Sequence, residues 1–177
     1  MKSKAAQTLT FLMVDSDEDD TILMQEAFYE SNMHSHLYCV KDAVQLAEYL
    51  RGDGIYQARD SYPLPNIILL ELGAPIITAL STLEWLKSSA ELRRIPVVIF
   101  ANGLDESLVS RAYELGASSY IVKPTTFCEL QRIVRGFHDY WSLCARPNVS
   151  ENYPARKDSK RTLTLAPSPV PANTNAH

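Results

Sequence analysis

Two patterns of hydrophobic and polar positions alternate along most of the chain. Short continuous apolar runs are typical of strands covered on both faces of a sheet, and apolar residues at intervals of three or four are typical of amphipathic helices. The predicted strands span residues 9–14, 36–40, 66–72, 96–100 and 117–122. The helical patterns that follow them begin with Ile22, Ala43, Leu80, Leu108 and Leu130. This alternation predicts an α/β fold, a doubly wound five-stranded parallel sheet with helices on both faces.

Turn-forming residues mark where several helices end or begin. Gly52 and Gly54 follow the second helical pattern, and Gly116 follows the fourth, where a glycine commonly ends a helix. Thr125 or Thr126 is placed to cap the last helix.

The sequence changes character at Pro147. The segment 147–177 holds half of the 10 prolines and many Ser, Thr and Asn residues. It cannot bury enough apolar surface to offset its ordering entropy, so we predict a disordered tail. The expected organisation is an N-terminal extension (1–8), one folded domain (9–146) and the tail (147–177).

Composition narrows the class of protein. The net charge of −4 gives no basic surface on which to predict a nucleic-acid partner. No apolar run approaches the roughly 20 residues that cross a bilayer, and the N-terminus lacks an apolar signal core. Cys39, Cys128 and Cys144 have no paired spacing, which indicates reduced thiols. These features favour a cytoplasmic protein with no membrane partner.

Charged residues follow the strands at one edge of the predicted sheet. Asp15 opens an acidic run after the first strand, Glu71 lies at the end of the third, and Lys123 follows the fifth. The carboxyl ends of parallel strands meet at one edge, where functional groups gather. We therefore expect these side chains to converge on a charged pocket.

The segments that carry these residues, FLMVDSDEDD, IILLELGAP, PVVIFAN and SYIVKP, resemble the receiver domains of two-component response regulators. The resemblance covers roughly Leu9 to Arg146 and implies a flavodoxin-like sheet of order 2-1-3-4-5. The long loop before the third strand and the final helix IVRGFHDYW are similar to single-domain regulators that partner bacterial phytochromes. The implied partner is a histidine kinase, a phytochrome-type photoreceptor or another regulator.

The resemblance also implies a phosphorylation site from which this chain departs. In that family an aspartate ending the third strand accepts a phosphoryl group, and two acids after the first strand hold Mg²⁺. A hydroxyl after the fourth strand contacts the phosphoryl group, and the lysine balances its charge. Here Asp15, Lys123 and the switch aromatic Tyr120 match the family. The acceptor, second acid, hydroxyl and loop-glycine positions hold Glu71, Ser16, Ala101 and Ala79.

Each departure weakens phosphorylation. The extra methylene of Glu71 moves its carboxylate by about 1.5 Å, and misplacement of about 1 Å can cost about 10²-fold in rate. Ser16 removes a carboxylate that Mg²⁺ prefers, and Ala101 removes a hydroxyl. We interpret the chain as a pseudo-receiver, not an enzyme, which signals by protein contact without phosphorylation at the usual site.

Two features of the pocket stay open to two interpretations each. Glu71 either mimics the phosphorylated state by reaching Lys123, or forms a simple buried ion pair. Asp15 and Glu71, with Asp17 or Glu18 and the backbone of Gly73, are weak candidates for Mg²⁺; alternatively the acidic run only favours a helix N-terminus. We assign no metal ligand and no cofactor.

Aromatic residues supply two further candidates. Tyr120 either sits permanently inward, in the space that Ala101 leaves, or is an ordinary half-exposed strand residue. Phe137, Tyr140 and Trp141 either form a homodimer interface on the last helix, which extends beyond what the sheet can cover, or close the core.

Two other functions remain as alternatives. One is a regulator that a phytochrome-type histidine kinase still phosphorylates. The other is an aspartyl-phosphate phosphatase with Asp15 as nucleophile and Asp17 as acid/base, for which Lys41-Asp42 and Asn102-Gly103 do not supply the expected partners.

Overall fold

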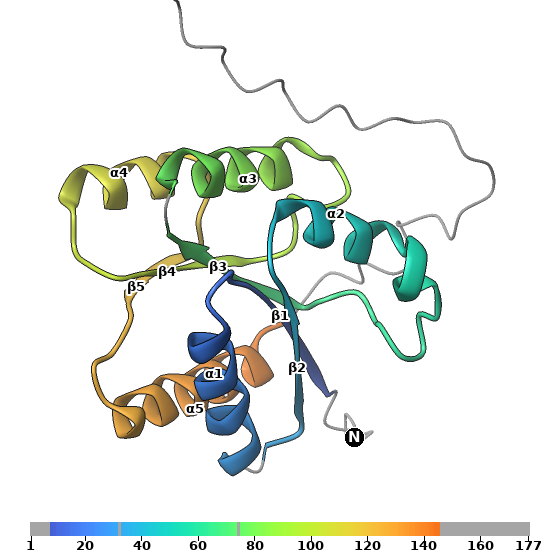
Figure 1. Ribbon diagram of the computed structural model, residues 1–177, viewed down its shortest axis with the longest axis horizontal. Coiled ribbons are helices and arrows are strands. Elements are labelled where there is room, and N and C mark those ends of the chain that lie inside the picture. Colours follow the sequence, from blue (N-terminus) through green and yellow to red (C-terminus); the bar gives the residue numbers. More distant parts are fainter. Residues whose placement is uncertain (1–7, 32, 74, 146–177) are drawn as a thin grey trace, which may run out of the picture.

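A computed structural model describes residues 8–31, 33–73 and 75–145 of this chain. The predicted tail (147–177) and most of the predicted N-terminal extension lie outside these residues. The described part is a five-stranded parallel sheet of order β2-β1-β3-β4-β5, flanked by helices (Figure 1). The elements are β1 (Leu9–Val14), α1 (Glu18–Glu30), β2 (Ser35–Val40), α2 (Ala43–Arg51), the 3₁₀ turn η1 (Gly54–Gln57), β3 (Ile67–Leu72), α3 (Ile76–Ser88), β4 (Val97–Ala101), α4 (Glu106–Glu114), β5 (Ser119–Val122) and α5 (Phe127–Leu143).

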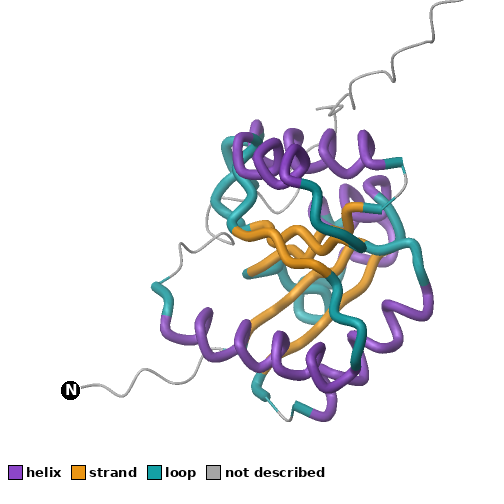
Figure 2. Tube along the Cα trace, turned by 90° about the vertical axis from the view of Figure 1, so that its left-hand side faces the viewer, coloured by secondary structure: helices purple, strands orange, loops and turns teal. Residues whose placement is uncertain are grey.

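Two helical layers cover the sheet, as Figure 1 and the tube view of Figure 2 show. Helices α1 and α5 pack on one face, and α2, α3 and α4 pack on the other. Successive residues of β1 point to opposite faces, so Leu12 and Val14 join one core while Phe11 and Met13 join the other. This two-sided burial explains the continuous apolar runs and confirms the predicted fold class.

Helix α1 begins at Glu18, one turn before Ile22, where the predicted apolar stripe begins. This first turn is polar. Asp17 caps the helix, because its side chain accepts hydrogen bonds from the backbone N–H groups of Asp19 and Asp20. Acidic residues fill the next positions, where they favour the helix dipole. Helix α3 likewise starts at Ile76, earlier than the predicted Leu80. The sequence pattern does not reveal this start, because Ile76 and Ile77 are exposed and belong to no buried stripe.

Helix ends follow the turn chemistry that the sequence predicts. Gly116, with φ of 93°, follows α4, and Gly52, with φ of 72°, ends α2. Thr126, rather than Thr125, caps α5 by accepting a hydrogen bond from the backbone of Glu129.

One arginine fixes the long segment between α2 and β3. The Arg59 guanidinium donates to the carbonyl oxygens of Tyr49 and Tyr62, at 2.8 and 3.2 Å, and to that of Leu50 at 2.6 Å. A cluster of four tyrosines packs beside it with ring centroids 5.0–6.1 Å apart: Tyr38, Tyr49, Tyr56 and Tyr62. The segment is therefore held in a defined conformation, although most of it outside η1 is irregular.

None of the helices in the described parts of the chain combines the length and the apolar character that a membrane span requires.

Candidate functional site

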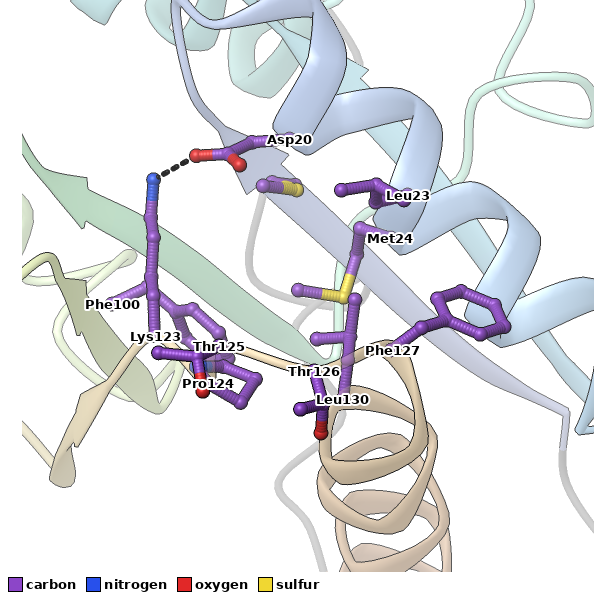
Figure 3. A pocket seen from close by; sticks show the side chains of 11 residues that line it. Asp20, Leu23, Met24, Phe100, Lys123, Pro124, Thr125, Thr126, Phe127 and Leu130 are labelled. Atoms are coloured by element: carbon purple, nitrogen blue, oxygen red, sulfur yellow. Dashed lines mark hydrogen bonds and ion pairs between the residues drawn. The ribbon is translucent and has the colours of Figure 1, made fainter.

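The carboxyl edge of the sheet brings one lysine together with three carboxylates. The Lys123 Nζ atom lies 3.1 Å from Asp15 Oδ2, 2.6 Å from Asp20 Oδ2 and 2.8 Å from Glu71 Oε1. The predicted convergence of Asp15, Glu71 and Lys123 is confirmed by these contacts. Asp20 is an additional member, and Figure 3 shows it reaching from α1 toward Lys123.

Backbone contacts set the positions of these side chains. Asp15 directly follows β1, and its Oδ1 accepts a hydrogen bond of 2.9 Å from the Asp17 N–H. Lys123 is placed by its own N–H, which donates to the Ala101 carbonyl at 2.7 Å. The Glu71 carboxylate folds against Gly73, where an added Cβ would lie only 3.0 Å from the carboxyl carbon. A side chain at position 73 would therefore push the Glu71 carboxylate aside by a few tenths of an ångström.

The sequence pattern does not distinguish Asp20 from the other acids of the run that begins at Asp15. The sequence could not show which of them faces the sheet edge. In the structure Asp17 is the helix cap and Glu18 pairs with Lys41 at 3.0 Å on the surface. These two candidate cation ligands thus have other contacts, and Asp20, one turn into α1, is the acid that joins Asp15 and Glu71.

Burial and mutual hydrogen bonding set the protonation of the group. Burial raises the pKa of Asp15 to about 6, and a hydrogen bond with Glu71 adds to this rise. Burial also opposes ionisation of Glu71, but hydrogen bonds from Asp15 and Lys123 outweigh it and lower the pKa of that carboxyl. The pKa of Lys123 is raised because its bonds to Asp20 and Glu71 outweigh the effect of burial. Asp15 therefore takes up a proton more readily than Glu71 does, beside a lysine that stays charged.

The remaining pocket positions hold Ser16, Ala101 and Tyr120. Ser16 is exposed, and its backbone N–H hydrogen-bonds the Glu71 carboxylate. Ala101 is only 2% exposed and pairs with Val122 in the sheet. Its methyl side chain offers no hydroxyl to the pocket. Tyr120 is partly buried, and its hydroxyl donates to the Gly103 carbonyl at 3.1 Å.

The aromatic residues of α5 divide between core and surface. Phe137 is 8% exposed and packs against Phe11 and Phe100, each at a centroid distance of 6.2 Å. Trp141 is partly buried against the same core, whereas Tyr140 is 63% exposed. Phe137 therefore fits the interpretation of a residue that closes the core. Tyr140 and Trp141 remain candidates for the predicted interface.

An apolar pocket of about 100 Å³ lies between α1 and α5, below the Asp20–Lys123 pair (Figure 3). Its lining includes Met13, Met24, Phe100 and Leu130 together with Lys123. The carbon stem of the lysine therefore runs along an apolar wall while its ammonium group reaches the carboxylates.

The strand order and the acids and lysine at the carboxyl edge define a receiver-like class of protein, and comparisons with known proteins agree. Response regulator Rcp1 of Synechocystis is 28% identical over 141 residues, covering 80% of this chain and 94% of that protein. The bacteriophytochrome response regulator RtBRR is 31% identical with a TM-score of 0.62, covering 83% of this chain and 89% of that one. The phosphorylated phytochrome response regulator RcpA is 29% identical with a TM-score of 0.70, covering 80% and 100%.

The chain belongs to the receiver domains of two-component response regulators. This finding confirms the resemblance drawn from its motifs. No family model matches the sequence.

The carboxylates invite a comparison with a divalent cation site. Asp15, Asp20 and Glu71 present ligand atoms within 4.8 Å of one another, and carboxylate oxygens are the ligands that hard divalent cations prefer. Rcp1, 28% identical to this chain with a TM-score of 0.67, has been solved in a Mn²⁺-bound form; the match covers 79% of this chain and 99% of that one. Here, however, the Lys123 ammonium contacts all three carboxylates. In this arrangement the ammonium group is the cation that neutralises the three carboxylates.

Proposed function

We propose that this chain is a pseudo-receiver, which signals by contact with other proteins and is not phosphorylated at residue 71. One observation carries the proposal. A lysine ammonium has three N–H donors, and Lys123 has three carboxylate acceptors at 2.6–3.1 Å. No donor is left to bind an incoming phosphoryl group without first breaking one of these pairs.

The surroundings of Glu71 support the same conclusion. Its carboxylate interacts with Lys123, Asp15 and the backbone of Ser16, so it is held on several sides. The contact of Glu71 with Lys123 supplies the negative partner that a phosphoryl group would otherwise offer. This arrangement supports a fixed signalling state, in which Glu71 mimics the phosphorylated form.

The partner that we propose is a histidine kinase, a phytochrome-type photoreceptor or another regulator in the cytoplasm. The support comes from the names of similar proteins, two of which are a phytochrome response regulator and a bacteriophytochrome response regulator. A net charge of −4 gives no basic footprint that would favour nucleic acid.

We further propose a homodimer through the outer end of α5. Tyr140 and Leu143 are 63% and 88% exposed there, and Trp141 is partly buried against the core. Large aromatic residues of this kind are enriched among the residues that dominate interface energies.

A small phosphodonor tests the central claim. We expect the wild-type protein, incubated with acetyl phosphate and Mg²⁺, to keep its intact mass. The matched variant Glu71→Asp/Ser16→Asp/Ala101→Thr restores the acceptor, the second acid and the hydroxyl, and should gain about 80 Da per phosphoryl group. A receiver with an aspartate acceptor, treated in parallel, verifies the donor.

A phosphoryl group mapped to Glu71 in the wild-type protein would refute the proposal. It would favour the alternative of a regulator that is still phosphorylated, as the similar protein RcpA is in its solved structure. For the mimic, equal partner affinity of the wild type, Glu71→Asp and Glu71→Gln would be the contrary result.

A further inference from the structure

Lys123 occupies the point at which the three carboxylates converge. Its side chain is only 12% exposed, and the side chain of Asp15 is fully buried. Asp20 and Glu71 complete the set from α1 and β3, at 36% and 12% side-chain exposure. The ammonium is thus enclosed by acids from three different elements and has little access to water.

The spacing of the acids suits this ammonium. Three tetrahedral N–H donors at about 2.8 Å place their acceptors about 4.6 Å apart. The three contacts of the Lys123 Nζ atom, at 2.6–3.1 Å, match these donor distances, and the ligand atoms of the acids lie within 4.8 Å of one another. Mg²⁺ instead needs oxygen ligands at roughly 2.0–2.1 Å, and a metal at the same point would meet the Lys123 Nζ atom.

The lysine has no easy route out of this position. Its stem lines the apolar pocket between α1 and α5, opposite Met24 and Leu130 (Figure 3). Withdrawing the ammonium would leave three carboxylates unpaired at a largely buried place, which is strongly unfavourable. Asp20 strengthens the arrangement, because it ties the lysine to α1 with the shortest of the three contacts, 2.6 Å.

We propose that Lys123 is the built-in cation of this site, and that its ammonium takes the place of a divalent metal ion. Asp15, Asp20 and Glu71 are its ligands. The wild-type site is therefore independent of Mg²⁺ and Mn²⁺, and loss of the lysine uncovers a divalent cation site made of the same three carboxylates. This inference extends the proposed function to the cation chemistry of the same pocket.

Manganese titration followed by electron paramagnetic resonance of the free ion tests the proposal. We expect the full-length wild-type protein to bind Mn²⁺ more weakly than about 1 mM, the weak end of protein cation sites. Lys123→Met keeps the apolar stem and removes the charge, and should bind at least about 50-fold more tightly because three carboxylates are freed. Adding Asp20→Asn to Lys123→Met should reverse most of that gain.

Lys41→Met is the matched control, since it removes one positive charge from the same edge without touching the three acids. We expect it to change the Mn²⁺ affinity by less than about 3-fold, because exposed charges are screened. If Lys123→Met is unfolded without metal, its melting temperature should appear and rise with added Mn²⁺, because binding stabilises the folded state.

Three results would overturn the proposal. One is tight wild-type Mn²⁺ binding that Lys123→Met leaves unchanged, and another is a folded Lys123→Met variant with no gain in affinity. The third is an equal gain in Lys41→Met. These readouts involve no phosphoryl group, so their failure is distinguishable from failure of the proposed function, which the mass measurement decides.

Discussion

Asp15 offers the sharpest test of the electrostatics of the pocket. Its side chain is fully buried beside a second carboxylate, and burial raises its pKa to about 6 from an ordinary value of 3.8. Asn has the same shape and no charge. We expect Asp15→Asn to stabilise the folded protein at neutral and alkaline pH, because the variant removes a buried negative charge and its amide can donate to the Glu71 carboxylate.

The size of the effect follows from the shift in pKa. A rise of about two units corresponds to about 3 kcal/mol, at 1.36 kcal/mol per unit. Part of this is offset, because the bond with Asp15 lowers the pKa of Glu71 and because the variant loses the 3.1 Å contact with Lys123. The expected net gain in the free energy of unfolding is about 1–2 kcal/mol at pH 8.

The sign of the pH dependence is fixed by the raised pKa. A carboxyl whose pKa is higher in the folded state binds more protons there, so its contribution to stability falls as pH rises from about 4 to about 6. The advantage of Asp15→Asn should therefore be small near pH 4 and reach its full value above pH 6. Urea unfolding followed by the fluorescence of Trp85 and Trp141, at pH 4 and pH 8, measures both.

Asp60→Asn is the control, because Asp60 is exposed and such changes usually stay within about 0.5 kcal/mol. The reasoning is refuted if Asp15→Asn lowers stability at pH 8 by more than about 1 kcal/mol. It is also refuted if the effect is the same at both pH values.

Two further predictions concern other parts of the molecule. Arg59→Leu should lower the free energy of unfolding by about 2–4 kcal/mol, because three partly buried carbonyl groups lose a charged donor. A loss below about 1 kcal/mol, or one equal to that of the exposed control Arg132→Leu, would contradict the carbonyl contacts. The wild type should sediment as a dimer at about 50 μM, a concentration that populates dimers of micromolar affinity, whereas Tyr140→Ala/Trp141→Ala should be monomeric and the exposed control Tyr29→Ala should not differ from wild type. Identical sedimentation of all three proteins would rule out the interface on α5.

The fold was predictable because its signals are local. Continuous apolar runs identify β1, β3 and β4 as strands buried on both faces, and Gly116 marks the end of α4 through its positive φ. The first turns of α1 and α3 were missed, because that of α1 contributes no buried residue and that of α3 contributes only Ala79, too few for a period to be detected. The packing of the Arg59 segment could not be predicted either, since its partners are backbone carbonyls, which carry no sequence signal.

The site was predictable in outline for a different reason. The carboxyl ends of parallel strands share an edge, which placed Asp15, Glu71 and Lys123 together from topology alone. The choice of Asp20 among neighbouring acids depends on the rotation of α1 about its axis. The burial of Phe137 depends in the same way on how α5 lies over the sheet. Such rotations are set by tertiary packing, which periodicity does not resolve within a single helix.

The three-to-one ratio of acids to lysine sets an order in which these positions can drift during evolution. Any one of the acids can be replaced first, since two remain to neutralise the ammonium. Lys123 cannot be replaced first, because its loss would strand buried negative charge. Among descendants of this sequence, the lysine should therefore outlast each of its acidic neighbours.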